Sequence, residues 1–362
     1  MEVFRIRMKI KIYLIASIIG TFFCLVGFAG INIYVDPLFH YHAPNNRLQY
    51  PLYDERYMND GITRNFTYDS IITGTSMTEN FKTSLWDELY DTTSIKVPFS
   101  GGTYKEVNDL LERAFERKTP IKTVVRSLDL TMLIEDKDSL DYEDYPNYLY
   151  DEYLWNDVNY VLNKDIFFSF TEYVFTFNRL GGNSTDFDTY KNWNGLYEYS
   201  EDLMREKHTR LEKENKTVSL TEEEIRMLTE NIEENVLALV KENPQTQFYF
   251  FIPPYSICYW DDLYNKGEIE KMIEAQRLEI ELIVPYDNVH LYSFFDREDI
   301  VCDLNNYRDS IHYNQVISDR IMESMYYGDG QITEENYKEY LRMLQKKYLT
   351  FDYDAFFADS DL

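Results

Sequence analysis

The chain has 362 residues and a formal net charge of −28, from 64 acidic and 36 basic side chains. This excess of negative charge argues against nucleic acid as a partner, because nucleic-acid binding depends on Lys and Arg side chains that neutralise phosphates. It also argues against the main body of the chain lying flat on an anionic lipid surface. Tyrosines number 33, and their apolar ring with a hydroxyl suits sugar binding as well as core packing.

The N-terminal segment predicts a membrane anchor. Residues 12–34 contain no charged side chain, and as a helix they would extend roughly 34 Å, enough to cross a hydrocarbon core of ~30 Å. The preceding segment, residues 1–11, carries four basic residues: Arg5, Arg7, Lys9 and Lys11. By the positive-inside rule, the N-terminus should stay in the cytoplasm and the rest of the chain should be extracytoplasmic. We therefore predict a single-pass cell-membrane protein that contacts the lipid bilayer through this helix; the alternative is a cleaved signal peptide, with small residues at Gly27 and Ala29.

The next segments predict an α/β domain. Residues 35–66 are rich in turn-forming residues and predict a juxtamembrane lead-in, and the folded domain is expected over residues 67–330. Strands are expected at residues 70–73, 95–99 and 121–130, and helices at residues 78–89 and 104–117. Strands that alternate with helices predict a parallel sheet covered by helices on both faces.

The alternation then stops and predicts an insertion over about residues 135–218. Its first part, residues 135–157, carries nine acidic residues, one lysine and five tyrosines. Such a length without strands is expected either to lie over the carboxyl edge of the sheet, where α/β folds bind ligands, or to form a packed helical or partly disordered appendage.

The alternation resumes near residue 220. Thr221 followed by Glu224 predicts a capping box at the start of a helix. Helices are expected at residues 220–242, 260–283, 315–325 and 333–347, and strands at residues 247–252 and 289–294. Residues 331–362 are expected to form the last helix and an acidic tail. One domain with an insertion is the simplest interpretation.

Residues 71–81 contain the best candidate for a nucleophile. A short apolar run ends at Gly74, Ser76 follows, and a helix-compatible segment comes next. A serine at a strand-to-helix turn is exposed above the sheet, close to the free N–H groups of the helix start. The alternative is that Ser76 is simply a helix-capping residue.

A serine hydroxyl needs a base, and the end of the chain offers one. Histidine has a suitable pKa, and a carboxylate on its other ring nitrogen fixes the tautomer. Asp309 and His312 could fill these roles, because they lie on a loop before a helix. A second Asp-x-x-His, Asp287 to His290, lies in an expected strand, where the histidine is interpreted as structural. The alternative for His312 is a surface histidine near a helix start.

Acyl transfer also requires donors for the developing oxyanion. The backbone N–H of Ser76 is one candidate, and Gly101 or Gly102, after the second expected strand, is another, since glycine lets the backbone approach a ligand closely. The alternative is that both glycines only form a turn.

Neither a metal nor a bound cofactor is expected. His40 and His42 with Asp36 are a weak match to a metal site, because two histidines on a juxtamembrane loop are too few. An oxidising exterior would permit a disulfide between Cys258 and Cys302, but the sequence leaves this pairing open.

In chain order, these segments resemble the motif blocks of the SGNH/GDSL hydrolase superfamily. In that family a serine follows the first strand, a glycine after the second strand contributes to the oxyanion hole, and a late Asp-x-x-His completes the triad. Three segments match in order and location: Gly74-Thr-Ser76, Ser100-Gly101-Gly102 and Asp309-Ser-Ile-His312. The resemblance covers most of residues 66–327 except the insertion and implies a three-layer, flavodoxin-like fold.

The resemblance is closest to the membrane-anchored branch that includes the D-alanine-transfer protein of teichoic acids and the alginate O-acetylation proteins. Further similarities are Tyr34-Val-Asp-Pro37, Leu128-Asp129 and Phe251-Ile-Pro-Pro-Tyr-Ser256. Two departures stand out: Thr75 replaces the usual aspartate of the first block, and residues 126–129, Arg-Ser-Leu-Asp, lack the asparagine of the third block, normally an oxyanion donor.

The resemblance implies an O-acyltransferase or esterase acting on a cell-envelope polysaccharide or a polyol-phosphate polymer through an acyl-serine intermediate. It also implies a polytopic membrane O-acyltransferase as a partner. The alternative is a catalytically inactive SGNH-fold scaffold for such an enzyme, which the missing asparagine favours and the intact Ser76, Asp309 and His312 disfavour.

Overall fold

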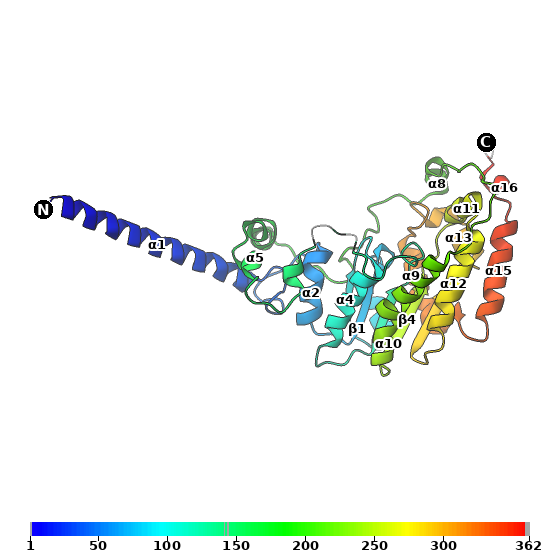
Figure 1. Cartoon of the computed structure of the whole chain (residues 1–362), viewed down its shortest axis with the longest axis horizontal. Coiled ribbons are helices and arrows are strands. Elements are labelled where there is room, and N and C mark those ends of the chain that lie inside the picture. The colour runs from blue at the N-terminus through cyan, green and yellow to red at the C-terminus, as the bar shows by residue number, and fades with distance from the viewer. Residues whose placement is uncertain (1, 141, 143–144, 359–362) are drawn as a thin grey trace. The chain divides into compact units, whose positions relative to one another are not determined.

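The computed structural model describes residues 2–140, 142 and 145–358 (Figure 1). It divides into two compact units. The first unit is formed by Met1–Phe66 and Asp144–Thr185, and the second by Thr67–Glu143 and Asp186–Leu362. The expected insertion is therefore shared between the units, because part of it groups with the N-terminal segment.

The first unit begins with a long helix, α1 (Glu2–Val35). Its stretch Phe4–Val35 is long and apolar enough to cross a membrane. The helix starts earlier than the uncharged stretch because the basic residues before Ile12 continue the same helical backbone. This part of the chain thus provides one helix of membrane-spanning length and composition.

The segment expected as a lead-in with turns contains a helix, α2 (Glu55–Asn65). Asp54 caps it by accepting a hydrogen bond from the Tyr57 N–H. Gly61, one of the turn-forming residues of this segment, lies inside the helix, where a Cβ would stand 2.0 Å from the Leu38 carbonyl oxygen. Only glycine fits at this position, because the backbone of Leu38 and Phe39 passes this close to the helix. The prediction that this segment forms turns was therefore wrong at α2.

The remainder of the first unit consists of short helical segments. They are η2 (Asn147–Leu149), α5 (Val158–Val161), α6 (Lys164–Ile166), the π-helical η3 (Phe167–Thr171) and α7 (Glu172–Arg179). This part of the insertion is therefore helical, as one of the two interpretations expected.

The second unit is an α/β fold with a six-stranded sheet of order β2-β1-β3-β4-β5-β6. The strands are β1 (Ser70–Gly74), β2 (Ser94–Pro98), β3 (Thr123–Ser127), β4 (Gln247–Ile252), β5 (Val289–Ser293) and β6 (Gln331–Ile332). The first five strands are parallel, and only β6 runs antiparallel to its neighbour. The predicted α/β class with a parallel sheet is confirmed; the two-residue β6 was not predicted.

Helices cover both faces of this sheet. On one face, Trp86 of α3 (Thr83–Tyr90) donates from its indole N–H to Thr123 Oγ1 at 3.2 Å. On the other face, Arg126 donates to the Asn235 carbonyl oxygen in η4 (Glu233–Leu237) at 2.7 Å. Side chains alternate along a strand, so Thr123 and Arg126 of β3 point to opposite faces.

The remaining helices complete these layers. They are η1 (Ser76–Thr78), α4 (Tyr104–Phe115), α8 (Glu201–Lys207), α9 (Glu222–Ile232), η4 (Glu233–Leu237), α10 (Ala238–Glu242), α11 (Ile257–Lys266), α12 (Ile269–Ile283), α13 (Glu298–Val301), η5 (Leu304–Asn306), α14 (Gln315–Tyr327), α15 (Tyr337–Thr350) and α16 (Tyr353–Phe357). Figure 1 shows α9, α12 and α15 side by side, and α12 packs against both of the others.

Several helices differ from expectation in their bounds or continuity. The helix expected at residues 260–283 is two helices, because Gly267 adopts a φ of +69° and a Cβ there would lie 1.9 Å from the Lys216 carbonyl oxygen. The helix expected from residue 78 begins at Thr83, after the 3-10 turn η1. In the described part of the expected tail, residues 353–357 form a further helix, α16. The capping box of Thr221 and Glu224 is confirmed.

Candidate active site

Ser76 follows the carboxyl end of β1, next to the point where the sheet topology reverses. The chain leaves β1 for β2 on one side and later returns to β3 on the other, and such switch points are where open α/β sheets bind ligands. Gly74 ends the strand with a φ of +136°, and a Cβ there would lie 2.3 Å from Ser127 Oγ. Only glycine fits both the backbone conformation and the space, so Gly74 fixes the turn that presents Ser76.

The structure brings Ser76, His312 and Asp309 into one hydrogen-bonded chain. Ser76 Oγ and His312 Nε2 are 2.9 Å apart although the residues are 236 positions apart in sequence. His312 Nδ1 lies 2.9 Å from Asp309 Oδ1 and 2.8 Å from Oδ2. With Nδ1–H donating to the carboxylate, Nε2 is left to accept the Ser76 hydroxyl proton. This arrangement matches the geometry that a serine nucleophile requires.

Asp309 is held by its own loop as well as by the histidine. The backbone N–H groups of Ile311 and His312 donate to Asp309 Oδ1 at 3.0 and 2.9 Å. Burial acts to raise the pKa of this carboxyl, but the hydrogen bond and charge of His312, together with the two backbone donors, outweigh it and lower the pKa. Asp309 therefore stays ionised and can stabilise a protonated His312.

The expected oxyanion donors differ in their availability. Gly102 N–H donates to the Phe99 carbonyl oxygen at 2.9 Å, so it is engaged within the turn and the expectation for Gly102 is not met in this conformation. Among the described residues, the N–H groups of Ser76 and Gly101 have no acceptor. Gly101 is exposed, with open space around the position of a Cβ. Ser76 and Gly101 thus stay the predicted donors.

The segment where the resemblance expects an asparagine contributes a buried carboxyl. Asp129 is 3% exposed and accepts a hydrogen bond from the Tyr255 hydroxyl at 3.1 Å. Burial raises the pKa of Asp129, against hydrogen bonds from Ser127, Thr75 and Tyr255 and the charge of His312. Arg126 is buried and donates hydrogen bonds to the backbone carbonyl oxygens of Asn235 and Tyr104. Neither residue supplies the side-chain amide of the third block.

Part of the insertion lies beside the catalytic candidates. The Trp193 ring meets the His312 ring edge-on, with centroids 5.8 Å apart. The Arg308 guanidinium carbon lies 4.2 Å from the Trp193 ring centroid and 4.0 Å from that of Tyr197. Arg308 is thus clamped between two aromatic rings immediately before Asp309. The contacts of Arg308 with these two rings were not predicted from the sequence. The sequence showed only that a cation precedes the Asp-x-x-His motif.

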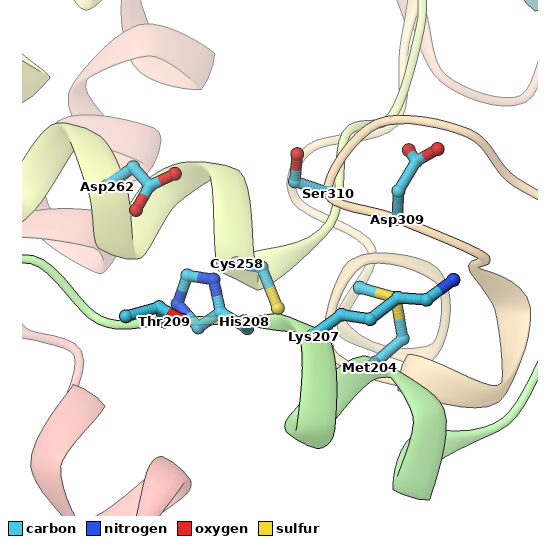
Figure 2. Close-up of a pocket in the computed structure, with 8 residues that line it drawn as sticks. All are labelled: Met204, Lys207, His208, Thr209, Cys258, Asp262, Asp309 and Ser310. Carbon is cyan, nitrogen blue, oxygen red and sulfur yellow. The ribbon is translucent and has the colours of Figure 1, made fainter.

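Two cavities open at Asp309. The first, about 330 Å³, is lined by Met204, Lys207, His208, Thr209, Cys258, Asp262, Asp309 and Ser310. Figure 2 shows Met204 and Lys207 rising from α8, opposite the loop with Asp309 and Ser310. The second, about 430 Å³, is lined by Leu196, Tyr197, Glu198, Leu203, Lys207, Arg308 and Asp309. Lys207 and Asp309 line both cavities, whereas Ser76 and His312 line neither of them.

Other histidines and the cysteines have different surroundings. His208 Nε2 lies 2.9 Å from Asp261 Oδ2, and His290 Nε2 lies 2.9 Å from Gln247 Oε1 on the sheet. Cys258 and Cys302 are free thiols. Burial raises the pKa of Cys258 to about 12 and that of Cys302 to about 11, so neither is a thiolate nucleophile near neutral pH.

The possible metal ligands near α1 serve the local fold. The Asp36 carboxylate accepts hydrogen bonds from the backbone N–H groups of His40, Tyr41 and His42 and from the Tyr160 hydroxyl. Within the described ranges, no group of three His, Cys, Asp or Glu side chains is arranged to hold a metal ion.

Comparison with known proteins adds little to this geometry. No protein-family model matches the chain, and no curated protein matches it. One solved structure, which its description assigns provisionally to a platelet activating factor from Streptococcus pneumonia, is similar at a TM-score of 0.39 and 12% identity. The match covers 79% of this chain and 90% of the other. A likeness this low carries no argument about function, which therefore depends on the site itself.

Proposed function

We propose that this protein is a membrane-anchored, extracytoplasmic enzyme of SGNH type that transfers or hydrolyses acyl esters. The hydrogen-bonded chain from Ser76 through His312 to Asp309 is the single observation that carries the proposal. Two segments far apart in sequence lie in contact, so that the serine hydroxyl can donate to the histidine and the histidine can donate to the aspartate, as in a serine activated by a general base. A surface histidine or a capping serine would not require this arrangement.

In the proposed reaction, Ser76 Oγ attacks the carbonyl carbon of an acyl donor while its proton passes to His312 Nε2. The tetrahedral intermediate collapses, and the leaving group departs with that proton. Water or a sugar hydroxyl then gives its proton to His312 and attacks the acyl-serine, and the proton returns to Ser76 Oγ as the product leaves. Asp309 stabilises the protonated imidazole in both halves, and the N–H groups of Ser76 and Gly101 would stabilise the oxyanion.

The proposed acceptor is a cell-envelope polysaccharide or a polyol-phosphate polymer. Tyr197, which is 52% exposed, lies beside Arg308 at the site, and Lys207 and Arg308 place two cations in the second cavity, although Glu198 and Asp309 line it too. The exposed ring of Tyr197 suits a sugar ring, and the cations suit phosphate groups. A polytopic membrane O-acyltransferase is the proposed partner that would supply the acyl group.

A catalytically inactive scaffold for such a membrane enzyme is the second candidate. The observation that favours it is the buried Asp129 in the segment where a side-chain amide donor would be expected. The intact hydrogen-bonded chain of Ser76 favours the enzyme.

Labelling of the full chain with a fluorophosphonate probe separates the two candidates. We expect labelling of the wild type, and at least a 10³-fold slower reaction for Ser76→Ala and for His312→Ala. Ser310→Ala is the matched control, since this neighbouring serine lines the first cavity and should leave labelling unchanged. No labelling of a folded wild type would favour the scaffold, and labelling that survives Ser76→Ala would refute the proposed nucleophile.

A further inference from the structure

Helical segments of the first unit pack against the last turns of α1. The rings of Phe28 and Phe167 stack with centroids 4.7 Å apart. Asn32 Nδ2 donates to the Val161 carbonyl oxygen at 3.1 Å, and Thr171 Oγ1 donates to Asn32 Oδ1 at 2.8 Å. Asn32 is fully buried by these contacts. The segment from α5 to η3 is therefore fixed to the end of the helix that can cross a membrane.

The position of these contacts along α1 gives their depth. Phe28 lies 16 residues after Ile12, where the uncharged stretch begins, which corresponds to about 24 Å of helix. Asn32 lies at about 30 Å on the same scale, at the far edge of a hydrocarbon core of ~30 Å. If α1 crosses a bilayer from Ile12, the Phe28–Phe167 stack is within the outer leaflet. Asn32 is then at its boundary, where its amide is satisfied by protein partners.

The same unit exposes large apolar side chains. Trp155 is 94% exposed, Leu154 78% and Phe168 65%. Further exposed apolar residues are Tyr153, Val158, Leu162, Tyr173, Phe175 and Leu180. Exposed Lys164 and Asp165 accompany them in α6, which suits a position at the headgroup level rather than full immersion. Trp and Tyr concentrate at this level of membrane proteins.

We propose that the segment 153–168, together with Phe28 of α1, forms a lipid-binding collar that inserts into the interface of the outer leaflet. The occupant is the phospholipid surface because the collar shares its depth with a membrane-spanning helix. The nearby acidic residues Asp151, Glu152 and Asp165 favour zwitterionic over anionic lipid. The collar does not depend on the catalytic proposal, since it uses no residue of that site.

Trp155 provides a built-in reporter. The other tryptophans are buried: Trp86 and Trp260 are 0% exposed and Trp193 is 7% exposed. The full chain is reconstituted in nanodiscs of phosphatidylcholine, with and without a lipid that carries a doxyl quencher near the headgroup. The fluorescence of Trp155 is taken as the difference between wild type and Trp155→Phe, which serves as the matched background.

We expect the doxyl lipid to reduce the Trp155 emission at least twofold and aqueous iodide to quench it at least threefold less than free tryptophan. In the Trp155→Phe background, Phe168→Trp should also be quenched by doxyl lipid. A Trp155 emission that is insensitive to doxyl lipid and fully open to iodide would overturn the proposal. If that exposed Trp155 became protected only when a membrane protein partner was added, the surface would be a protein interface and the lipid collar would likewise be wrong.

Discussion

The buried carboxyl group of Glu279 allows a quantitative prediction of how the stability of the protein depends on pH. This residue of α12 is 0% exposed. Burial raises the pKa of its carboxyl to about 8, with the nearby Tyr104 hydroxyl acting in the opposite direction and the charge of Asp129 reinforcing the shift. In the unfolded chain its pKa returns to 4.5. The folded protein therefore binds this proton more tightly than the unfolded chain does, and the stability from this group is lost as the pH rises from 4.5 to 8.

The size of the effect follows from the linkage relation. Each pH unit between the two pKa values costs about 1.36 kcal/mol in the free energy of unfolding. Between pH 5 and pH 7, Glu279 should therefore remove about 2 to 3 kcal/mol of stability. The side chain of Glu279→Gln cannot ionise. Between pH 5 and pH 7, the decrease in the free energy of unfolding should therefore be about 2 to 3 kcal/mol smaller for this variant than for the wild type.

The assay is chemical denaturation of the full chain in mild detergent at pH 5, 6 and 7, followed by circular dichroism. The difference between wild type and Glu279→Gln at each pH isolates this one group from all other titrating residues. Glu270→Gln is the matched control, because Glu270 is exposed on the same helix and should change the pH dependence by only a few tenths of a kcal/mol. An identical pH dependence in wild type and Glu279→Gln would refute the reasoning.

Two further predictions concern the candidate active site, both read out by fluorophosphonate labelling. Gly74→Ala should slow labelling of Ser76 at least tenfold, because its Cβ would meet Ser127 Oγ at 2.3 Å. Gly181→Ala, which also has a positive φ but open space, should not slow it, and equal rates would show that Gly74 does not position the serine. Asp309→Asn should slow labelling about 10³- to 10⁴-fold, because the carboxylate no longer stabilises the protonated imidazole; a near wild-type rate would remove Asp309 from the mechanism.

The sheet could be predicted because its strands have a strong local signal. Buried parallel strands are short apolar runs, and those of β1, β2, β3, β4 and β5 are bounded by polar or turn-forming residues. β6 has only two residues, and its pairing with β5 depends on a tertiary contact that no periodicity encodes.

Helix positions that depend on a close backbone contact with a distant segment could not be predicted from the sequence. Gly61 and Gly267 are both glycines where another part of the chain passes within about two ångströms of a would-be Cβ, at Leu38 and Lys216. One lies inside a helix and the other ends a helix, yet each is simply a glycine in the sequence. Local patterns therefore missed α2, in a segment predicted to form turns, and merged α11 with α12.

In the candidate site too, residues within local patterns could be predicted, and residues brought together by long-range contacts could not. Ser76 was recognisable because a strand end and a helix-like segment flank it, and His312 because an aspartate three residues earlier can reach its ring within one loop. Arg308 and its two aromatic neighbours required the path of the insertion, since Trp193 and Tyr197 come from a segment without strand or helix periodicity. The candidate reacting groups are thus specified by short local patterns, whereas the residues around them are brought together by long-range packing. Substitutions in the insertion should accordingly change which acceptors are used before they change the reactivity of Ser76 itself.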